Sequence, residues 1–88
     1  MTTVKAHEVK AMASSLNRSN ANLSACKGNM ELMQGLAIVE RNIVEAKGMK
    51  CRSAQANESL KVALAHAEGV LKEGHARRLR ASIRAHTA

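Results

Sequence analysis

Residues 30–44, MELMQGLAIVERNIV, contain nine apolar side chains among fifteen, and these point in most directions around a helical axis. A helix that is apolar on more than one face is usually central in a bundle or buried in an oligomer. The β-branched residues of this stretch would also suit a strand. However, the steps of three and four that separate Leu36, Val39, Ile43 and Ala46, together with the helical patterns on both sides, favour a helix.

One apolar stripe of this stretch is a candidate contact surface for a second copy of the chain or for a partner protein. In a two-helix hairpin each helix buries only one seam, so pairing of two hairpins into a four-helix bundle would complete the fold. We therefore predict an oligomer or partner seam that contains Leu32, Leu36, Val39 and Ile43.

Another apolar stripe begins upstream and leads into the same stretch. Its members alternate steps of three and four, as in a coiled coil, and only one of them is polar: Val9, Met12, Leu16, Ser19, Leu23, Cys26, Met30, Met33 and Ala37. Lys27 and Gly28 resemble a helix C-terminus. The sequence thus predicts a helix over about 4–27 and a second over 29–47, either separated at Gly28 or continuous through it.

Downstream of Gly48, which gives a second stop signal, a last helix is expected over 54–86. Its apolar positions lie four apart after Leu71, so the stripe rotates around the helix axis. Gly69 and Gly74 each weaken a helix by roughly 1 kcal/mol relative to Ala, so packing against other helices must sustain it.

The composition agrees with an all-α fold. The 88 residues contain no Phe, Tyr, Trp or Pro, although 45% are hydrophobic, and this apolar content is mostly of helix-favouring types. A core of small and medium side chains in so short a chain is marginal. We predict one helical domain over residues 1–88, a long helical hairpin or a three-helix bundle, completed by self-association.

Charge and the missing aromatic residues narrow the classes of partner. A net charge of +7 favours acidic proteins, nucleic acids or anionic lipids. Without aromatic side chains there is no platform for base stacking and no interfacial anchor, and no run approaches the ~18 apolar residues of a membrane span. We expect no membrane partner. Cys26 and Cys51 fit no disulfide framework, so they are expected to be reduced in a cytoplasmic protein.

Four arginines near the C-terminus are the strongest candidate for binding a partner. On a helix, three of them share one side, roughly opposite Leu79 and Ile83. Arginine makes bidentate contacts with carboxylates and phosphates alike. Cations also belong at a helix C-terminus because they oppose its dipole, but four in eight residues exceed that need. The predicted partner-binding residues are Arg77, Arg78, Arg80 and Arg84.

Residues 9–28 also fit part of a helix-turn-helix pattern. Asn17 would stand in the turn, and Ser19 would cap a recognition helix that opens with Ser-Asn-Ala-Asn. Arg18, however, occupies a position where an apolar side chain normally locks the two helices together. The same residues fit an uninterrupted helix, which we favour.

The sequence predicts no enzyme, no cofactor, no metal site and no small-molecule substrate. It contains no Asp, no nucleophile motif and no phosphate-binding glycine loop. His66 and His75 are nine residues apart, which puts them on opposite faces of a helix, and the two cysteines lie in no metal-binding spacing.

Two functional hypotheses follow. The preferred one is a non-enzymatic helical interaction module, such as an adaptor, assembly factor or inhibitor, that docks a basic helical face on an acidic surface of a larger protein. The alternative is a nucleic-acid-binding protein that contacts duplex phosphates through the C-terminal arginines or through the helix-turn-helix at 9–28.

Overall fold

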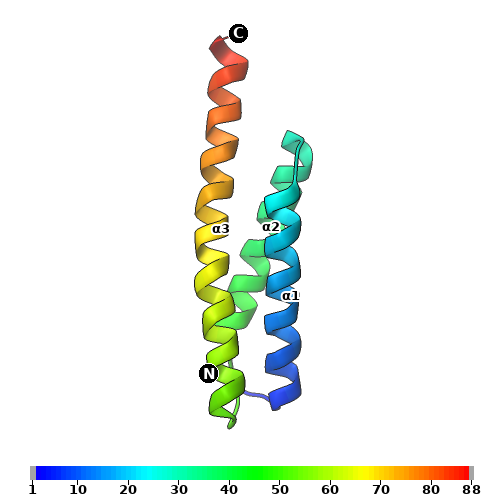
Figure 1. The fold of residues 1–88 in the computed structure, drawn as a ribbon, viewed down its shortest axis with the longest axis vertical. Helices are drawn as coiled ribbons and strands as arrows, with labels where there is room; N and C mark the ends of the chain where they lie inside the picture. Colours follow the sequence, from blue (N-terminus) through cyan, green and yellow to red (C-terminus); the bar gives the residue numbers. More distant parts are fainter. Residues whose placement is uncertain (1, 88) are drawn as a thin grey trace.

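The chain turns at Gly28, so it forms three helices rather than two. The computed structural model describes residues 2–87, and the side chains of 3–85, in the order β1 (Thr2–Thr3), α1 (Ala6–Ala25), α2 (Asn29–Lys47), β2 (Met49–Lys50) and α3 (Ala54–Thr87). Each helix packs against the other two, in a bundle with extents of 54 × 18 × 16 Å (Figure 1). The all-α three-helix bundle is thereby confirmed. Self-association stays a prediction.

The turn between α1 and α2 interrupts the N-terminal heptad stripe. Leu16 and Leu23 on α1 are buried, whereas Met30 and Met33 on α2 are 75% and 50% exposed. One buried stripe that continues from residue 9 to 37 is therefore the wrong alternative. The extended backbone of Cys26 ends α1, and α2 then returns along the bundle with a different apolar face toward the core.

The face that α2 buries is the predicted oligomer seam, and this requires a correction. Its side chains belong to the core of a single chain, because both α1 and α3 pack against α2. None of them is available to a second copy or a partner while the bundle is intact. The four residues are Leu32, Leu36, Val39 and Ile43.

Close approach of the three helices depends on two glycines that face Leu23. A Cβ atom built on Gly74 of α3 would lie 2.7 Å from Cδ2 of Leu36 and 3.4 Å from Cδ2 of Leu23. A Cβ atom on Gly35 of α2 would lie 3.0 Å from Cδ1 of Leu23. The glycines that weaken the helices locally thus allow the helix contacts that sustain them.

At the end of the bundle away from the α1–α2 turn, β1 and β2 form a short parallel pair. Thr2 pairs with Met49 and Thr3 with Lys50, and the Val4 N–H donates to the Lys50 carbonyl at 2.8 Å. This pairing fixes the start of the chain beside the connection from α2 to α3.

Two neighbouring polar residues of α1 are buried in different ways. Ser19 donates to the Leu16 carbonyl at 3.0 Å and accepts a hydrogen bond from Asn42 Nδ2 of α2 at 3.1 Å. Asn20 is only 2% exposed, and neither its Nδ2 nor its Oδ1 has a hydrogen-bond partner among the described residues. The Asn20 amide therefore loses its hydration without compensation.

We expect Asn20→Ala to raise the free energy of unfolding by about 1 kcal/mol, because relief of the uncompensated amide and a better helix propensity outweigh a small cavity. Ser19→Ala, the matched control, should lower it by about 1 kcal/mol because it breaks the contact with Asn42. Urea unfolding followed by circular dichroism measures both changes. Destabilisation of similar size in the two variants would contradict the assignment.

The two glycines of α3 should respond to alanine with opposite signs. A Cβ on Gly69 meets nothing within 4 Å, so Gly69→Ala should stabilise the protein by about 0.5–1 kcal/mol through helix propensity. Gly74→Ala should destabilise it, because overpacking against Leu36 costs about 1–3 kcal/mol. Thermal unfolding tests the pair, and a gain in Tm for Gly74→Ala equal to that for Gly69→Ala would refute the close contact.

Candidate functional site

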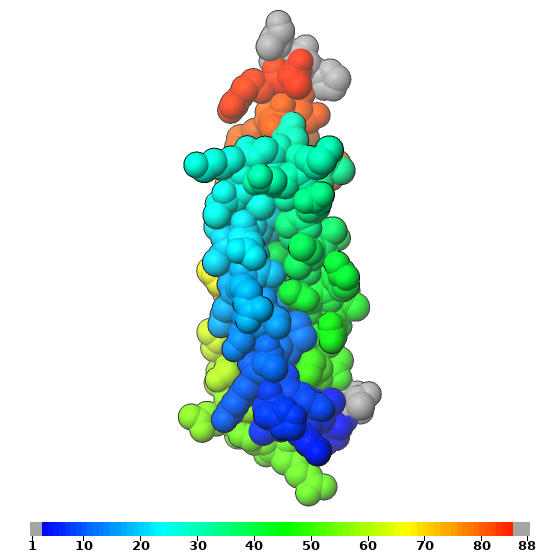
Figure 2. Space-filling view, turned by 90° about the vertical axis from the view of Figure 1, so that its right-hand side faces the viewer, coloured from blue at the N-terminus to red at the C-terminus, as the bar shows by residue number. Residues whose placement is uncertain are grey.

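The C-terminal part of α3 projects beyond the turn that joins α1 and α2 (Figures 1 and 2). With 34 residues against 20 in α1, α3 is roughly 20 Å longer. Leu79 and Ile83 lie roughly opposite Arg77 around the helix axis, and they are 63% and 53% exposed.

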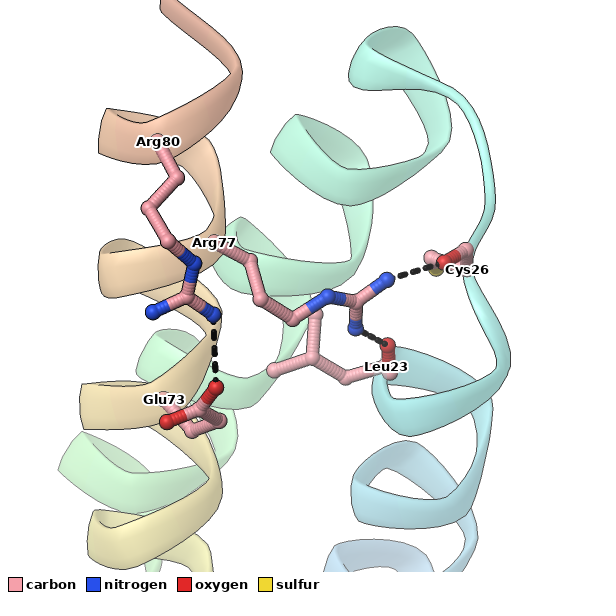
Figure 3. A network of polar contacts seen from close by, with 5 residues as sticks. All are labelled: Leu23, Cys26, Glu73, Arg77 and Arg80. Carbon is pink, nitrogen blue, oxygen red and sulfur yellow. Dashed lines mark hydrogen bonds and ion pairs between the residues drawn. The ribbon is translucent and has the colours of Figure 1, made fainter. Parts of the chain in front are cut away.

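Arg77 points back toward α1 instead of into solvent (Figure 3). Its Nη1 donates to the carbonyl of Leu23 at 3.3 Å, and its Nη2 donates to the carbonyl of Cys26. These carbonyls lie at the end of α1, where backbone acceptors lack partners within the helix. Because α1 has no basic residue in its own last turn, Arg77 also supplies the cation that opposes its dipole.

Arg80 is oriented by a contact within its own helix. Its Nη2 lies 2.9 Å from Oε1 of Glu73, and both side chains are largely exposed to solvent (Figure 3). An exposed ion pair of this kind contributes little to stability. It does, however, restrict the range of positions of the guanidinium group.

Three of the predicted partner-binding arginines meet at one hollow beside the α1–α2 turn. The hollow has a volume of about 200 Å³, and we call it the basic notch; its lining includes Lys27, Asn29, Leu32, Arg77, Arg80 and Arg84. Arg78 is exposed and is not part of this lining. The structure therefore separates Arg78 from the other three arginines.

Lys27 and Asn29 line the notch, but the sequence pattern did not predict them as binding residues. Both flank Gly28, for which the sequence predicted only a helix end. In a bundle with an up-down-up order, the first turn lies beside the distal part of the third helix. That topological argument could have placed Lys27 near the arginines once three helices were chosen.

The helix-turn-helix alternative at 9–28 is wrong. Helix α1 runs without interruption through Asn17 and Ser19, so this stretch contains no turn that would lead into a recognition helix. Ser19, the expected cap, is buried against Asn42 instead. The stripe of apolar residues on α1 serves packing within the bundle.

Among the described side chains, the histidines and cysteines do not gather into a site. His75 Nε2 lies 3.1 Å from Oε1 of Glu40, which joins α3 to α2. Within residues 2–87, no group of three or more His, Cys, Asp or Glu has an arrangement that could hold a metal ion. In the same part of the chain, no helix combines the length and the apolar character of a membrane span.

In comparisons with protein-family models, with curated proteins and with solved structures, nothing matches this chain. The chemistry of the basic notch and of the projecting end of α3 is therefore the basis for a functional hypothesis.

Arg77→Lys should lower the free energy of unfolding by about 1–2 kcal/mol. Lysine keeps the charge but cannot present the planar fork that reaches two carbonyls at once. Arg78→Lys is the matched control, because the same substitution at the adjacent exposed position should change stability by less than about 0.5 kcal/mol. Urea unfolding compares the two variants. Equal stabilities would contradict a structural role for Arg77.

Proposed function

We propose that this protein is a non-enzymatic helical interaction module that docks the projecting end of α3 into an acidic-rimmed apolar groove of a larger protein. The observation that carries the proposal is the exposure of Leu79 and Ile83, which lie on the side of α3 roughly opposite Arg77 and the basic notch. An adaptor, an assembly factor or an inhibitor could work in this way.

The spacing and charge of the projecting turns support docking of a helix in a groove. Leu79 and Ile83 are four residues apart and so share one side of α3, as anchors of a docked helix do. Burying two such side chains contributes about 1.5–3 kcal/mol each. The neighbouring Arg78 and Arg84 would meet carboxylates at the rim and speed association.

Pre-formed structure further supports this mode of binding. The projecting turns already belong to a helix whose N-terminal half is packed in the bundle. Binding of these turns therefore costs less conformational entropy than binding of a disordered segment would.

Self-association remains part of the proposal, but it requires a different surface from the one expected. The exposed side of α2 carries Met30, Met33 and Val44, which a second copy could cover. We also propose a cytoplasmic location, which the two free cysteines support.

Nucleic acid stays the alternative because the basic notch collects several cations at one place. Duplex DNA carries a charge about every 1.7 Å along its axis, and useful affinity requires a row of phosphate contacts. Cations that converge on one hollow suit such a row less well than they suit a compact acidic group.

The proposal predicts that Leu79→Ser/Ile83→Ser abolishes capture of the physiological partner from an extract of the source cells, because both apolar anchors are lost. Val62→Ser is the matched control, since Val62 lies on the same helix and is 61% exposed but is far from the projecting end. Quantitative mass spectrometry of the captured proteins measures the difference. Circular dichroism verifies that all variants remain folded.

Partners should be depleted by about tenfold or more in the double variant and retained in Val62→Ser. An unchanged set of partners, or equal losses from both variants, would exclude the projecting end as the docking element. The chain has no Trp or Tyr, so strong near-ultraviolet absorbance of the purified sample, in the region where aromatic side chains and nucleic-acid bases absorb, would reveal a bound component. Absorbance that nuclease removes would favour the nucleic-acid alternative.

A further inference from the structure

We infer that the basic notch is a binding site for a single phosphate group. Four cationic side chains line it, and they come from two segments about fifty residues apart: Lys27 follows α1, and Arg77, Arg80 and Arg84 belong to α3. Among the described residues that line the notch there is no Asp or Glu. Such a concentration of positive charge attracts an anion.

Arg77 gives the site a fixed donor. Its contacts with the carbonyls of Leu23 and Cys26 hold the guanidinium group in place beside the notch (Figure 3). These contacts use two of its N–H groups and leave the others for a ligand. Arg80 donates one N–H to Glu73 and likewise keeps further donors. Phosphate oxygens accept such charge-assisted hydrogen bonds in pairs.

The start of α2 adds a second kind of donor. Its N-cap is Gly28, and no side chain caps this helix end. The first backbone N–H groups of a helix have no acceptor within it, and they lie at the positive end of its dipole. Asn29 brings this helix start into the lining of the notch. Combined with the arginines, these groups could surround a tetrahedral anion from two sides.

Two acidic side chains near the notch neutralise only part of its charge. Glu31 accepts a hydrogen bond from the Lys27 N–H at 3.5 Å, and Glu73 pairs with Arg80. Arg77 already contacts the carbonyls of Leu23 and Cys26, so bracing the end of α1 does not require Lys27. The mutual repulsion of the cations would be relieved by an anion with two negative charges.

The size of the notch favours one phosphate group over a nucleic acid. A hollow of about 200 Å³ has room for such a group. A nucleic acid would instead place successive phosphates along a line. The site shares Arg84 with the docking proposal but does not use Leu79 or Ile83, so it goes beyond that proposal and can be present whether or not it holds.

The test is a titration of the full chain with sodium phosphate against sodium chloride at equal ionic strength. Phosphate should cause saturable shifts in the NMR signals of the Gly28, Asn29 and Met30 amides and of the Arg80 Nε. It should also raise Tm by about 5–10 °C beyond the chloride sample at about ten times Kd, because a ligand that binds only the folded state stabilises it.

Lys27→Gln/Arg80→Gln should weaken phosphate binding by about tenfold or more while Arg77 continues to support the fold. The matched control is Lys72→Gln/Arg78→Gln, which removes the same two positive charges from α3 positions outside the notch. General stabilisation of proteins by phosphate would persist in both variants. Equal responses of the two variants, or shifts that do not saturate, would overturn the site.

The source of the phosphate is distinguished by a parallel titration with O-phospho-L-serine. Binding at least as tight as that of inorganic phosphate would assign the site to a phosphorylated side chain, and exclusion of phosphoserine would assign it to the free ion. A short DNA duplex is the third ligand. Duplex binding with a salt slope of several phosphates, weakened equally by Arg18→Gln on α1, would overturn the single-phosphate site in favour of a nucleic-acid surface.

Discussion

The close contact of three helices around Leu23 is the constraint on which the rest of the structure depends. Leu23 is enclosed because Gly35 of α2 and Gly74 of α3 have no side chains to hold the helices apart. In a chain without aromatic residues, dense packing has to come from backbones that approach closely. One turn further along α3, Arg77 reaches the end of α1 only because that approach has been made.

The same contact links stability to the candidate site. Arg77 ties α3 to the carbonyls at the end of α1, and its position in turn brings Arg80 and Arg84 beside Lys27. The fold thus creates a concentration of positive charge where two segments distant in sequence meet. On the opposite side of these turns of α3, Leu79 and Ile83 are exposed. The proposed binding surface and the brace formed by Arg77 come from consecutive turns of one helix.

Much of the fold could be predicted from periodicity and composition. The steps of three and four in α2 and the absence of proline were enough to predict helices, and Gly28 and Gly48 were recognised as stop signals. Sequence periodicity shows which residues share one face of a helix, but it does not show which segment or molecule packs against that face. For this reason the pattern predicts an oligomer or partner seam at Leu32, Leu36, Val39 and Ile43, although α1 and α3 of the same chain bury them.

The sequence predicted only part of the candidate site. Its arginines follow one another on a single helix, but the hollow forms only where that helix meets Lys27 and Asn29. The sequence by itself determined an all-helical chain with a strongly basic C-terminal segment. Only the tertiary structure decided that Arg77 braces α1, that Lys27 joins Arg80 and Arg84, and that Arg78 stands apart. The physical reason is that local propensity acts over a few residues, whereas the contacts of Arg77 join residues more than fifty positions apart in sequence.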